Sequence, residues 1–454
     1  MKSIIVCITF LYLFTQCSLW ERYQSQKEEL SGGDTTTFDR TLNAFNKPAS
    51  NLKNHNKILK FNKGNQTFKA TWTNEQGKKL TGLGPLFNSN SCNGCHFLSG
   101  RGHNKLEGEK DFRSMIFKLS YEKLSPLPGY GSQIQDKSIN KEKISIEVTP
   151  NVTFQEKKGH FPDGEEYTLL EPKYEFTNWK YGEPEKFSFS PRVAPVIYGM
   201  GLLSLISEET LKAIADPEDK NKDGISGKIN MAFHYKTREQ KVGRFGWKAS
   251  HPDIKQIISV ALHQDMGITS ELFPNQNCEP EQIQCKKAQG NNKPEIDKDT
   301  FDDLDYYTML VAVPARRYVQ DSDVLQGRKL FSGIGCINCH IRELKTGNNL
   351  EYPELSNQVI YPYTDLLLHD MGEGLADGVR EFSASGKEWR TSPLWGLGMY
   401  PLVSQHNRLL HDGRARGVKE AILWHGGEAE TSKQRFMNLS KSERLLLIKY
   451  IESL

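Results

Sequence analysis

The chain has 454 residues, a formal net charge of +3, 25% charged residues and 37% hydrophobic residues. A chain of this length can form two or three domains, each with its own core. The small net charge, without a basic stripe interleaved with aromatic residues, argues against a nucleic-acid-binding protein.

Residues 1–17, MKSIIVCITFLYLFTQC, carry one positive charge followed by an apolar run. The run is too short to span a bilayer and is typical of a secretory signal peptide. Cys17 ends the run and is a candidate lipidation site, although Gln16 is not the small residue that usually precedes such a cysteine. The alternative is that Cys7 and Cys17 leave with the signal. We therefore expect a protein in the periplasm, or otherwise outside the cytoplasmic membrane, with Cys17 as a candidate lipid anchor.

Residues 18–75 form a polar lead-in that is rich in asparagine and lysine. The sequence then contains the same five-residue pattern, Cys-x-x-Cys-His, at 92–96 (CNGCH) and again at 336–340 (CINCH). Chance would give roughly 0.004 copies in a chain of this composition. The repeated pattern therefore calls for a chemical explanation.

Cys-x-x-Cys-His is the attachment signature of c-type haem. Two thiolates at this spacing reach the two vinyl groups of one porphyrin, and the histidine supplies the proximal ligand of the iron. A zinc site would need both cysteine pairs to converge, and a redox dithiol has no use for the histidines. We predict two covalent haems, held by Cys92, Cys95 and His96 and by Cys336, Cys339 and His340.

Short alternating runs follow the first motif, at 114–121, 144–150, 166–172 and 173–179, and predict strands. Helical patterns follow at 207–216, which Ser207 would cap, and at 253–267.

Asp219, Asn221 and Asp223 alternate before Gly224, as at the start of a calcium loop. The closing glutamate of such a loop is replaced by Asn230. A plain Asp/Gly turn is therefore the alternative to a calcium site.

Cys278 and Cys285 bracket CEPEQIQC, and a short-loop disulfide is the natural interpretation in an exported protein; two free thiols are the alternative. A linker near 311–323 precedes a helix that leads into the second motif. The chain closes with an amphipathic helix that Ser440 and Glu443 would cap with a capping box.

The predicted fold is mainly α. It comprises two cytochrome c-like haem domains, at 76–314 and 315–454, with a small β-rich insertion at about 115–186 in the first.

Longer blocks extend these patterns. The second half contains EWRTSPLWGLG, LLHDGRARGVKEAILWH, PYTDLLLHDMGEGLADG and AILWHGGEAE, and the first half contains SPRVAPVIYGMG and GRFGWKAS. These blocks resemble the bacterial di-haem cytochrome c peroxidase superfamily, and most closely its branch of di-haem oxidoreductases named for peroxidase or thiol oxidoreductase activity. The resemblance covers nearly the whole chain from Gly82 onward.

The resemblance implies axial ligands. In the superfamily the distal ligand of the second haem lies fourteen residues after the histidine of His-Asp-Gly, which is His411 here, and the count leads to His425. Met371 is the rival ligand, and a helix-end histidine is the alternative role for His425. The stretch before Arg192 has no histidine where the peroxidases have a mobile one, which implies an open first haem unless His103 binds it.

The resemblance also implies catalytic residues. Trp247 corresponds to the tryptophan between the haems and is a candidate electron carrier. Asp265 then falls near the family's glutamate and is the candidate acid–base residue, with a helix-end carboxylate as the alternative role. The family's glutamine position falls on Ile257, with Gln256 beside it as the candidate. His411 is expected at a haem edge, and Arg192 and Arg244 are expected to bind haem propionates.

These features predict an exported di-haem oxidoreductase that reduces hydrogen peroxide with electrons from a small cytochrome or copper protein. An oxidase of another substrate, such as a thiol or a protein-derived group, and a non-enzymatic electron carrier are the alternatives. An open first haem would distinguish the enzymes from the carrier.

Overall fold

The structure is a computed structural model that describes residues 22–75, 80–105, 109, 112–120, 126–288 and 294–454. The predicted signal peptide and Cys17 lie outside these residues. No helix in the described ranges is both long and apolar enough to cross a membrane.

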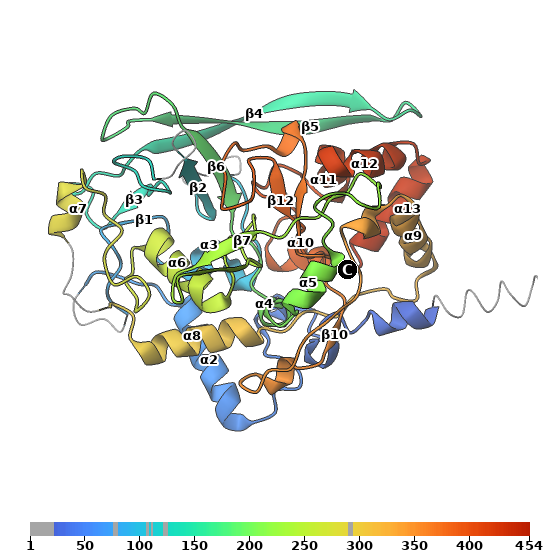
Figure 1. The fold of residues 1–454 in the computed structure, drawn as a ribbon, viewed down its shortest axis with the longest axis horizontal. Helices are drawn as coiled ribbons and strands as arrows, with labels where there is room; N and C mark the ends of the chain where they lie inside the picture. Colours follow the sequence, from blue (N-terminus) through green and yellow to red (C-terminus); the bar gives the residue numbers. More distant parts are fainter. Residues whose placement is uncertain (1–21, 76–79, 106–108, 110–111, 121–125, 289–293) are drawn as a thin grey trace, which may run out of the picture.

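The α-helices are α2 (His55–Lys69), α3 (Cys92–Cys95), α4 (Met200–Ser204), α5 (Glu208–Ile214), α6 (Ile254–Met266), α7 (Ile283–Lys287), α8 (Lys298–Leu310), α9 (Ser322–Gly333), α10 (Tyr400–Val403), α11 (Val418–Trp424), α12 (Glu430–Met437) and α13 (Lys441–Ile451). Short 3₁₀ turns are η1 (Gly33–Thr35), η2 (Ala44–Asn46), η3 (Phe97–Ser99), η4 (Cys336–Asn338), η5 (Pro353–Leu355), η6 (Glu373–Leu375), η7 (Leu397–Met399) and η8 (Gly427–Ala429). Figure 1 shows their arrangement.

The strands are β1 (Leu86–Phe87), β2 (Met115–Ser120), β3 (Lys137–Ser138), β4 (Thr149–His160), β5 (Glu166–Thr177), β6 (Ser188–Val193), β7 (Met231–His234), β8 (Glu239–Val242), β9 (Leu344–Lys345), β10 (Val359–Ile360), β11 (Leu368–Asp370) and β12 (Glu388–Arg390). Among the described residues they form six two-stranded antiparallel sheets: β1–β3, β2–β6, β4–β5, β7–β8, β9–β10 and β11–β12.

The prediction of a mainly α fold with two cytochrome c-like domains is wrong. The structure is 32% helical and 18% strand, with several small sheets. The physical reason lies in the length and pairing of the elements: most of the helices span fewer than ten residues, and strands pair into small antiparallel sheets in both halves of the chain. The chain therefore runs through long irregular segments between short elements.

The long β4–β5 hairpin is the most extended element and lies along the top of the view in Figure 1, across both halves of the molecule. Its base packs on the first half, where Phe176 contacts Phe117 of β2 with ring centroids 5.3 Å apart. Its tip packs on the second half, where Phe161 contacts Phe436 of α12 at 6.1 Å. Arg444 of α13 also pairs with Asp163 at the tip, at 2.6 Å. The hairpin therefore ties the two halves together.

Two helix pairs have the same local design. Gly64 of α2 lies against the backbone of α8, so a Cβ there would collide with the carbonyl oxygen of Asp303. Gly327 of α9 lies in the same way against Leu446 of α13. Glycine permits each close approach because it has no side chain.

The residue four positions after each glycine is a phenylalanine whose ring lies beside the histidine of a Cys-x-x-Cys-His turn. The Phe68 ring centroid lies 6.3 Å from that of His96, and the Phe331 centroid lies 6.4 Å from that of His340. The partner helix adds a tyrosine to each pair: Tyr307 lies 5.3 Å from Phe68, and Tyr450 lies 5.4 Å from Phe331. Each Cys-x-x-Cys-His turn is thus placed against an equivalent helix pair.

Candidate functional site: two haem-attachment turns

The first Cys-x-x-Cys-His turn opens into a large cavity. Helix α3 comprises the Cys-x-x-Cys segment, and the backbone N–H of His96 donates to the carbonyl of Cys92 at 2.8 Å. Both thiols and the imidazole line a cavity of about 530 Å³. The cavity therefore begins at the predicted attachment point of the first haem.

The four cysteines of the two turns are free thiols. Burial raises the pKa of Cys92, Cys95 and Cys336 to about 12. A redox dithiol needs a thiol whose pKa is lowered, so these environments do not suit dithiol chemistry. In the described part of the chain the four thiols do not converge into one cluster, so they do not form a tetrathiolate zinc site.

Three histidines have their rings fixed in the same way. His96 Nδ1 lies 2.6 Å from the carbonyl oxygen of Pro195, and His340 Nδ1 lies 2.9 Å from that of Tyr363. His425 Nδ1 lies 2.5 Å from the carbonyl oxygen of Ala421. A carbonyl partner requires Nδ1 to carry the proton, which leaves Nε2 as a lone-pair donor for a metal.

Burial keeps these imidazoles neutral, which is the state that binds metals. Burial lowers the pKa of His96 and of His340 to about 4, in each case against the opposing carbonyl hydrogen bond. Burial also lowers the pKa of His425. His425 is close enough to His340 to lower the pKa of His340 further. The nearness of His425 to His340 suits two imidazoles on one iron.

The residues around the first cavity fit a haem. Its lining includes the apolar residues Phe68, Val196, Leu203 and Leu304, and the Phe68 ring lies next to that of His96. Arg244 Nε and Trp395 Nε1, which belong to lining residues, are buried without a hydrogen-bond partner among the described residues. Unsatisfied buried donors are costly, and haem propionates are groups that would satisfy them.

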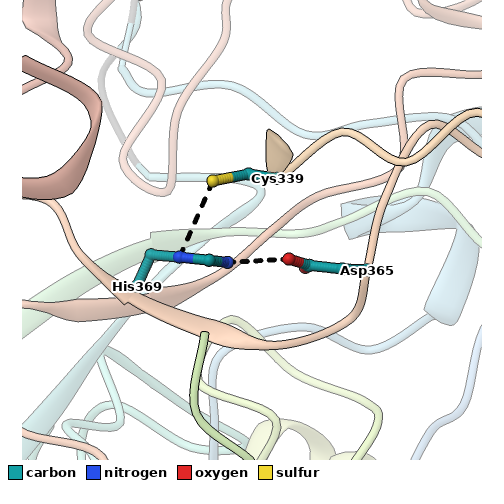
Figure 2. Close-up of side chains that lie close together, drawn as sticks. All are labelled: Cys339, Asp365 and His369. Atoms are coloured by element: carbon teal, nitrogen blue, oxygen red, sulfur yellow. Dashed lines mark hydrogen bonds and ion pairs between the residues drawn. The ribbon is translucent and has the colours of Figure 1, made fainter. Parts of the chain in front are cut away.

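The second turn is bordered by a charged group, shown in Figure 2. His369 Nε2 lies 2.8 Å from Asp365 Oδ2, and His369 Nδ1 lies 3.6 Å from Cys339 Sγ. His369 Nδ1 also lies 2.6 Å from Glu428 Oε2. Burial alone would lower the pKa of His369, but the hydrogen bonds to Asp365, Cys339 and Glu428 raise it to about 12. The carboxylates of Asp365 and Glu428 therefore favour the protonated imidazole, which places a positive charge beside Cys339.

Of the predicted catalytic residues, Asp265 and Trp247 line the first cavity. Asp265 Oδ1 accepts a hydrogen bond from Gln133 Nε2 at 2.7 Å, and burial raises the pKa of this carboxyl. Trp247 Nε1 donates to the carbonyl of Val193 at 2.9 Å.

Gln256 is placed differently. It is not one of the residues lining this cavity, and both ends of its amide bond the backbone: Nε2 donates to Phe233 O and Oε1 accepts from Tyr235 N, each at 2.9 Å. In this geometry Gln256 fixes a hairpin, and its neighbour Ile257 lines the cavity instead.

The remaining predicted contact residues occupy distinct positions. Arg192 lines the cavity but already pairs with Glu381, at 2.7 Å. His411 is buried and stacks on Trp389, with ring centroids 3.8 Å apart and planes inclined by 10°. The rival ligand His103 bonds the carbonyl of Asn104 at 2.6 Å and is not one of the lining residues.

The candidate calcium loop uses its carboxylates internally. Asp219 accepts from the backbone N–H groups of Asp223 and Gly224, at 3.0 and 3.2 Å. Asn221 Oδ1 also accepts from the Asp223 N–H. In the described ranges the group of His, Cys, Asp and Glu side chains that gathers closely enough to hold a metal is Cys339, Asp365 and His369.

Cys278 and Cys285 are joined by a disulfide. This bond holds the segment before α7, whose Gln282 reaches the buried carboxyl of Glu147 at 2.6 Å.

Several polar residues of the first cavity were missing from the prediction, among them Lys118, His251 and Glu381. Lys118 and Glu381 are separated by more than half of the chain, and no local pattern marks either residue. His251 has a weak signal, because it follows the Gly-x-Phe-Gly-Trp segment by four residues, but a single histidine is more often structural.

Each of the two turns has a neutral histidine whose Nδ1 is held by a backbone carbonyl, and each turn lies against an equivalent helix pair. These features together define a di-haem protein. The family described as "Di-haem oxidoreductase, putative peroxidase" has a model that matches residues 25–115 and 185–454. The chain therefore belongs to this di-haem oxidoreductase family. The unmatched interval contains the β4–β5 hairpin.

A solved structure of hydrazine synthase from Kuenenia stuttgartiensis resembles the chain at 13% sequence identity, with a TM-score of 0.37 and 87% of each chain covered. No curated protein matches the chain.

Proposed function

We propose that this chain is an exported c-type di-haem oxidoreductase that reduces hydrogen peroxide with electrons from a small redox protein. The observation that carries the proposal is the difference between the two attachment turns. His425 lies near His340, so two imidazoles can close the second iron. The first turn opens into a cavity of about 530 Å³ that is lined by both apolar and charged side chains.

A haem iron with one open position supplies peroxide binding and electron transfer. The chain must supply proton transfer and charge stabilisation. Reduction of one hydrogen peroxide consumes two electrons and two protons and gives two waters, so a base must accept a proton from one oxygen and an acid must protonate the oxygen that leaves. Asp265 is one candidate, because its carboxyl lines the cavity and burial raises its pKa.

The proposal includes covalent attachment of both haems through Cys92, Cys95, Cys336 and Cys339. The four thiols of the two Cys-x-x-Cys-His turns are free, and none is engaged in a disulfide, which supports it. Acidified acetone removes non-covalent haem, so the expected result is a denatured chain that keeps two haems by mass spectrometry.

The proposed location is outside the cytoplasmic membrane, and the proposed electron donor is a small cytochrome c or cupredoxin. The apolar run in residues 1–17 supports export. The N-terminus of the mature protein tests this part: cleavage before Cys17 with an added lipid indicates an anchor, cleavage without lipid indicates a free exported protein, and an intact Met1 contradicts export. A filled calcium loop at Asp219, Asn221 and Asp223 is also proposed, and metal analysis of the purified protein would test it.

The test of function is peroxide consumption by protein that carries both haems, with a reduced small cytochrome c as donor. The proposal predicts that two donors are oxidised for each peroxide consumed. Failure of the haem-loaded protein to react with peroxide would contradict it and favour the alternative oxidase or electron-carrier functions.

A further inference from the structure

One wall of the first cavity carries a cluster of polar side chains from separate parts of the fold. Lys118 lies on β2 and Arg192 lies on β6. His251 lies in the segment after β8, and Glu381 lies in the loop before β12. Three atoms of this wall, Arg192 Nη2, His251 Nδ1 and Glu381 Oε2, are buried and have no hydrogen-bond partner among the described residues. Buried polar atoms without partners are unusual and call for a ligand or a function.

The backbone holds His251 in place. Its N–H donates to the carbonyl of Phe245 at 3.2 Å, and its carbonyl accepts from the N–H groups of Arg244 and Phe245, each at 3.0 Å. Gly246, at φ +82°, lies beside the ring, and a Cβ there would come into van der Waals contact with His251 Cδ2 at 3.4 Å. The imidazole is therefore positioned in the cavity wall by main-chain contacts, while its Nδ1 stays unpartnered.

This free Nδ1 separates His251 from the three histidines that suit iron ligation. His96, His340 and His425 each have Nδ1 fixed by a backbone carbonyl, which determines the tautomer. His251 has no such partner in the described part of the chain, so either ring nitrogen can take or release a proton.

The surrounding charges suit a transient proton carrier. Burial lowers the pKa of His251 to about 4; Glu381 and Asp253 oppose this shift, and Lys118 and Arg192 reinforce it. Burial would raise the pKa of Glu381, but Arg192 and Lys118 bring it down to about 2, so this carboxylate stays ionised. A neutral imidazole near two cations accepts a proton and is driven to return it.

Asp265, the other candidate in the cavity, is more restrained. Its side chain bonds Gln133, and its main-chain carbonyl accepts from Asn88 and Ser89. These contacts fix the end of α6 and leave the carboxyl less free to exchange protons.

We infer that His251 is the proton-transfer residue of the first haem site and that Arg192 stabilises the departing oxygen. The imidazole accepts a proton from one oxygen of hydrogen peroxide and delivers it to the other, which leaves as water; the oxygen that stays takes up two protons from solvent and two electrons and becomes the second water. The two electrons come from the protein's haem groups and ultimately from the donor. This inference rests on the proposed peroxidase function.

The test compares His251→Gln with wild-type protein in rapid mixing with hydrogen peroxide, following the optical band of the first haem. Acid–base catalysis contributes about 10²- to 10⁴-fold, so the bimolecular rate constant is expected to fall at least about 100-fold. The control is His234→Gln: His234 is also buried, its ring bonds Thr237 and Asp253, and it does not line this cavity. The control rate is expected to match that of wild type.

An EPR spectrum of each oxidised variant distinguishes the two roles that His251 could play, proton transfer and ligation of the iron. The inference predicts that His251→Gln leaves the resting spectrum unchanged. Loss of a low-spin signal in this variant would make His251 an iron ligand and overturn the inference. A rate constant with peroxide that is unchanged in His251→Gln would also overturn the inference, as would a rate loss found in Asp265→Asn instead. If wild-type protein with both haems does not react with peroxide, the proposed function itself is overturned.

Glu381→Gln keeps the inference testable if His251→Gln fails to bind both haems. Glu381 raises the pKa of His251, so its neutralisation should lower this pKa and move the acid limb of the pH–rate profile to lower pH. An acid limb that does not move would contradict proton transfer by His251.

Discussion

Lys248 Nζ and Asp377 Oδ1 form an ion pair of 3.0 Å in which both side chains are excluded from solvent, with 0% and 1% exposure. The ammonium also donates to the carbonyl of Ser385 at 2.7 Å and lies 4.3 Å from the centre of the Trp389 ring. Trp389 in turn stacks on His411. The pair therefore packs against the stacked rings of Trp389 and His411, and it joins segments that are 129 residues apart.

Lys248→Met is expected to destabilise the fold by about 3–5 kcal/mol, because it leaves the Asp377 carboxylate buried beside a neutral group. The double variant Lys248→Met/Asp377→Asn should recover much of this loss. Urea denaturation of the haem-loaded protein measures both. Equal destabilisation by the single and double variants would contradict the ion-pair account.

His425→Met should raise the reduction potential of the second haem, because a thioether ligand favours the ferrous state more than imidazole does. Redox titration with optical detection measures the shift. Met371→Leu is the matched control and should leave the potential unchanged. If Met371→Leu shifts the potential and His425→Met does not, Met371 is the ligand.

Gly327→Ala should destabilise the contact between α9 and α13 by roughly 1–3 kcal/mol, since its Cβ would meet the main chain of Leu446. Gly333→Ala, in the same helix, is the control: nothing lies within 4 Å of its Cβ, so alanine should add roughly 0.5–1 kcal/mol of stability through helix propensity. Thermal unfolding of both variants measures these two changes in stability. Similar behaviour of the two would show that the close helix contact is unimportant.

Asp305 predicts a specific pH dependence of stability. Burial raises the pKa of its carboxyl from 3.8 to about 6, against the lowering effects of Lys255 and the Tyr352 hydroxyl. The folded state therefore holds this proton more tightly than the unfolded state. The contribution of the protonated Asp305 carboxyl to the free energy of unfolding is complete below about pH 4 and is lost as pH rises through 6. The two-unit shift corresponds to roughly 3 kcal/mol.

Asp305→Asn should remove this dependence, because the amide oxygen still accepts from Tyr352 and carries no charge. Denaturation at pH 4 and pH 8 measures the slope. Asp299→Asn, at an exposed position of the same helix, is the control. A variant that keeps the wild-type slope would assign the pH dependence to another group.

Local signals predicted local structure well. Ser207 caps α5 through the N–H of Thr210, and Ser440 and Glu443 form the predicted capping box of α13; both predictions are confirmed. These features depend on a few neighbouring residues. The predicted strands were less accurate, because 166–172 and 173–179 are a single strand, β5, that continues through Pro172 opposite β4.

Long-range features were not predictable from the sequence. The segments LHQDMG (Leu262–Gly267) and LLHDMG (Leu367–Gly372) are similar in sequence, but the first lies at the end of α6 and the second in β11 and the turn after it. The actual equivalence is between Gly64–Phe68 and Gly327–Phe331, which share spacing and tertiary contacts but little sequence. Likewise, the polar wall around His251 depends on folding, since Lys118 and Glu381 come from distant segments.

The most direct test of the central claim is an EPR spectrum of the fully oxidised protein with both haems bound. An open first iron and a second iron held by His340 and His425 predict one high-spin ferric signal and one low-spin signal typical of two imidazoles. Two low-spin signals would mean that both irons are closed in this state, which contradicts an open first haem.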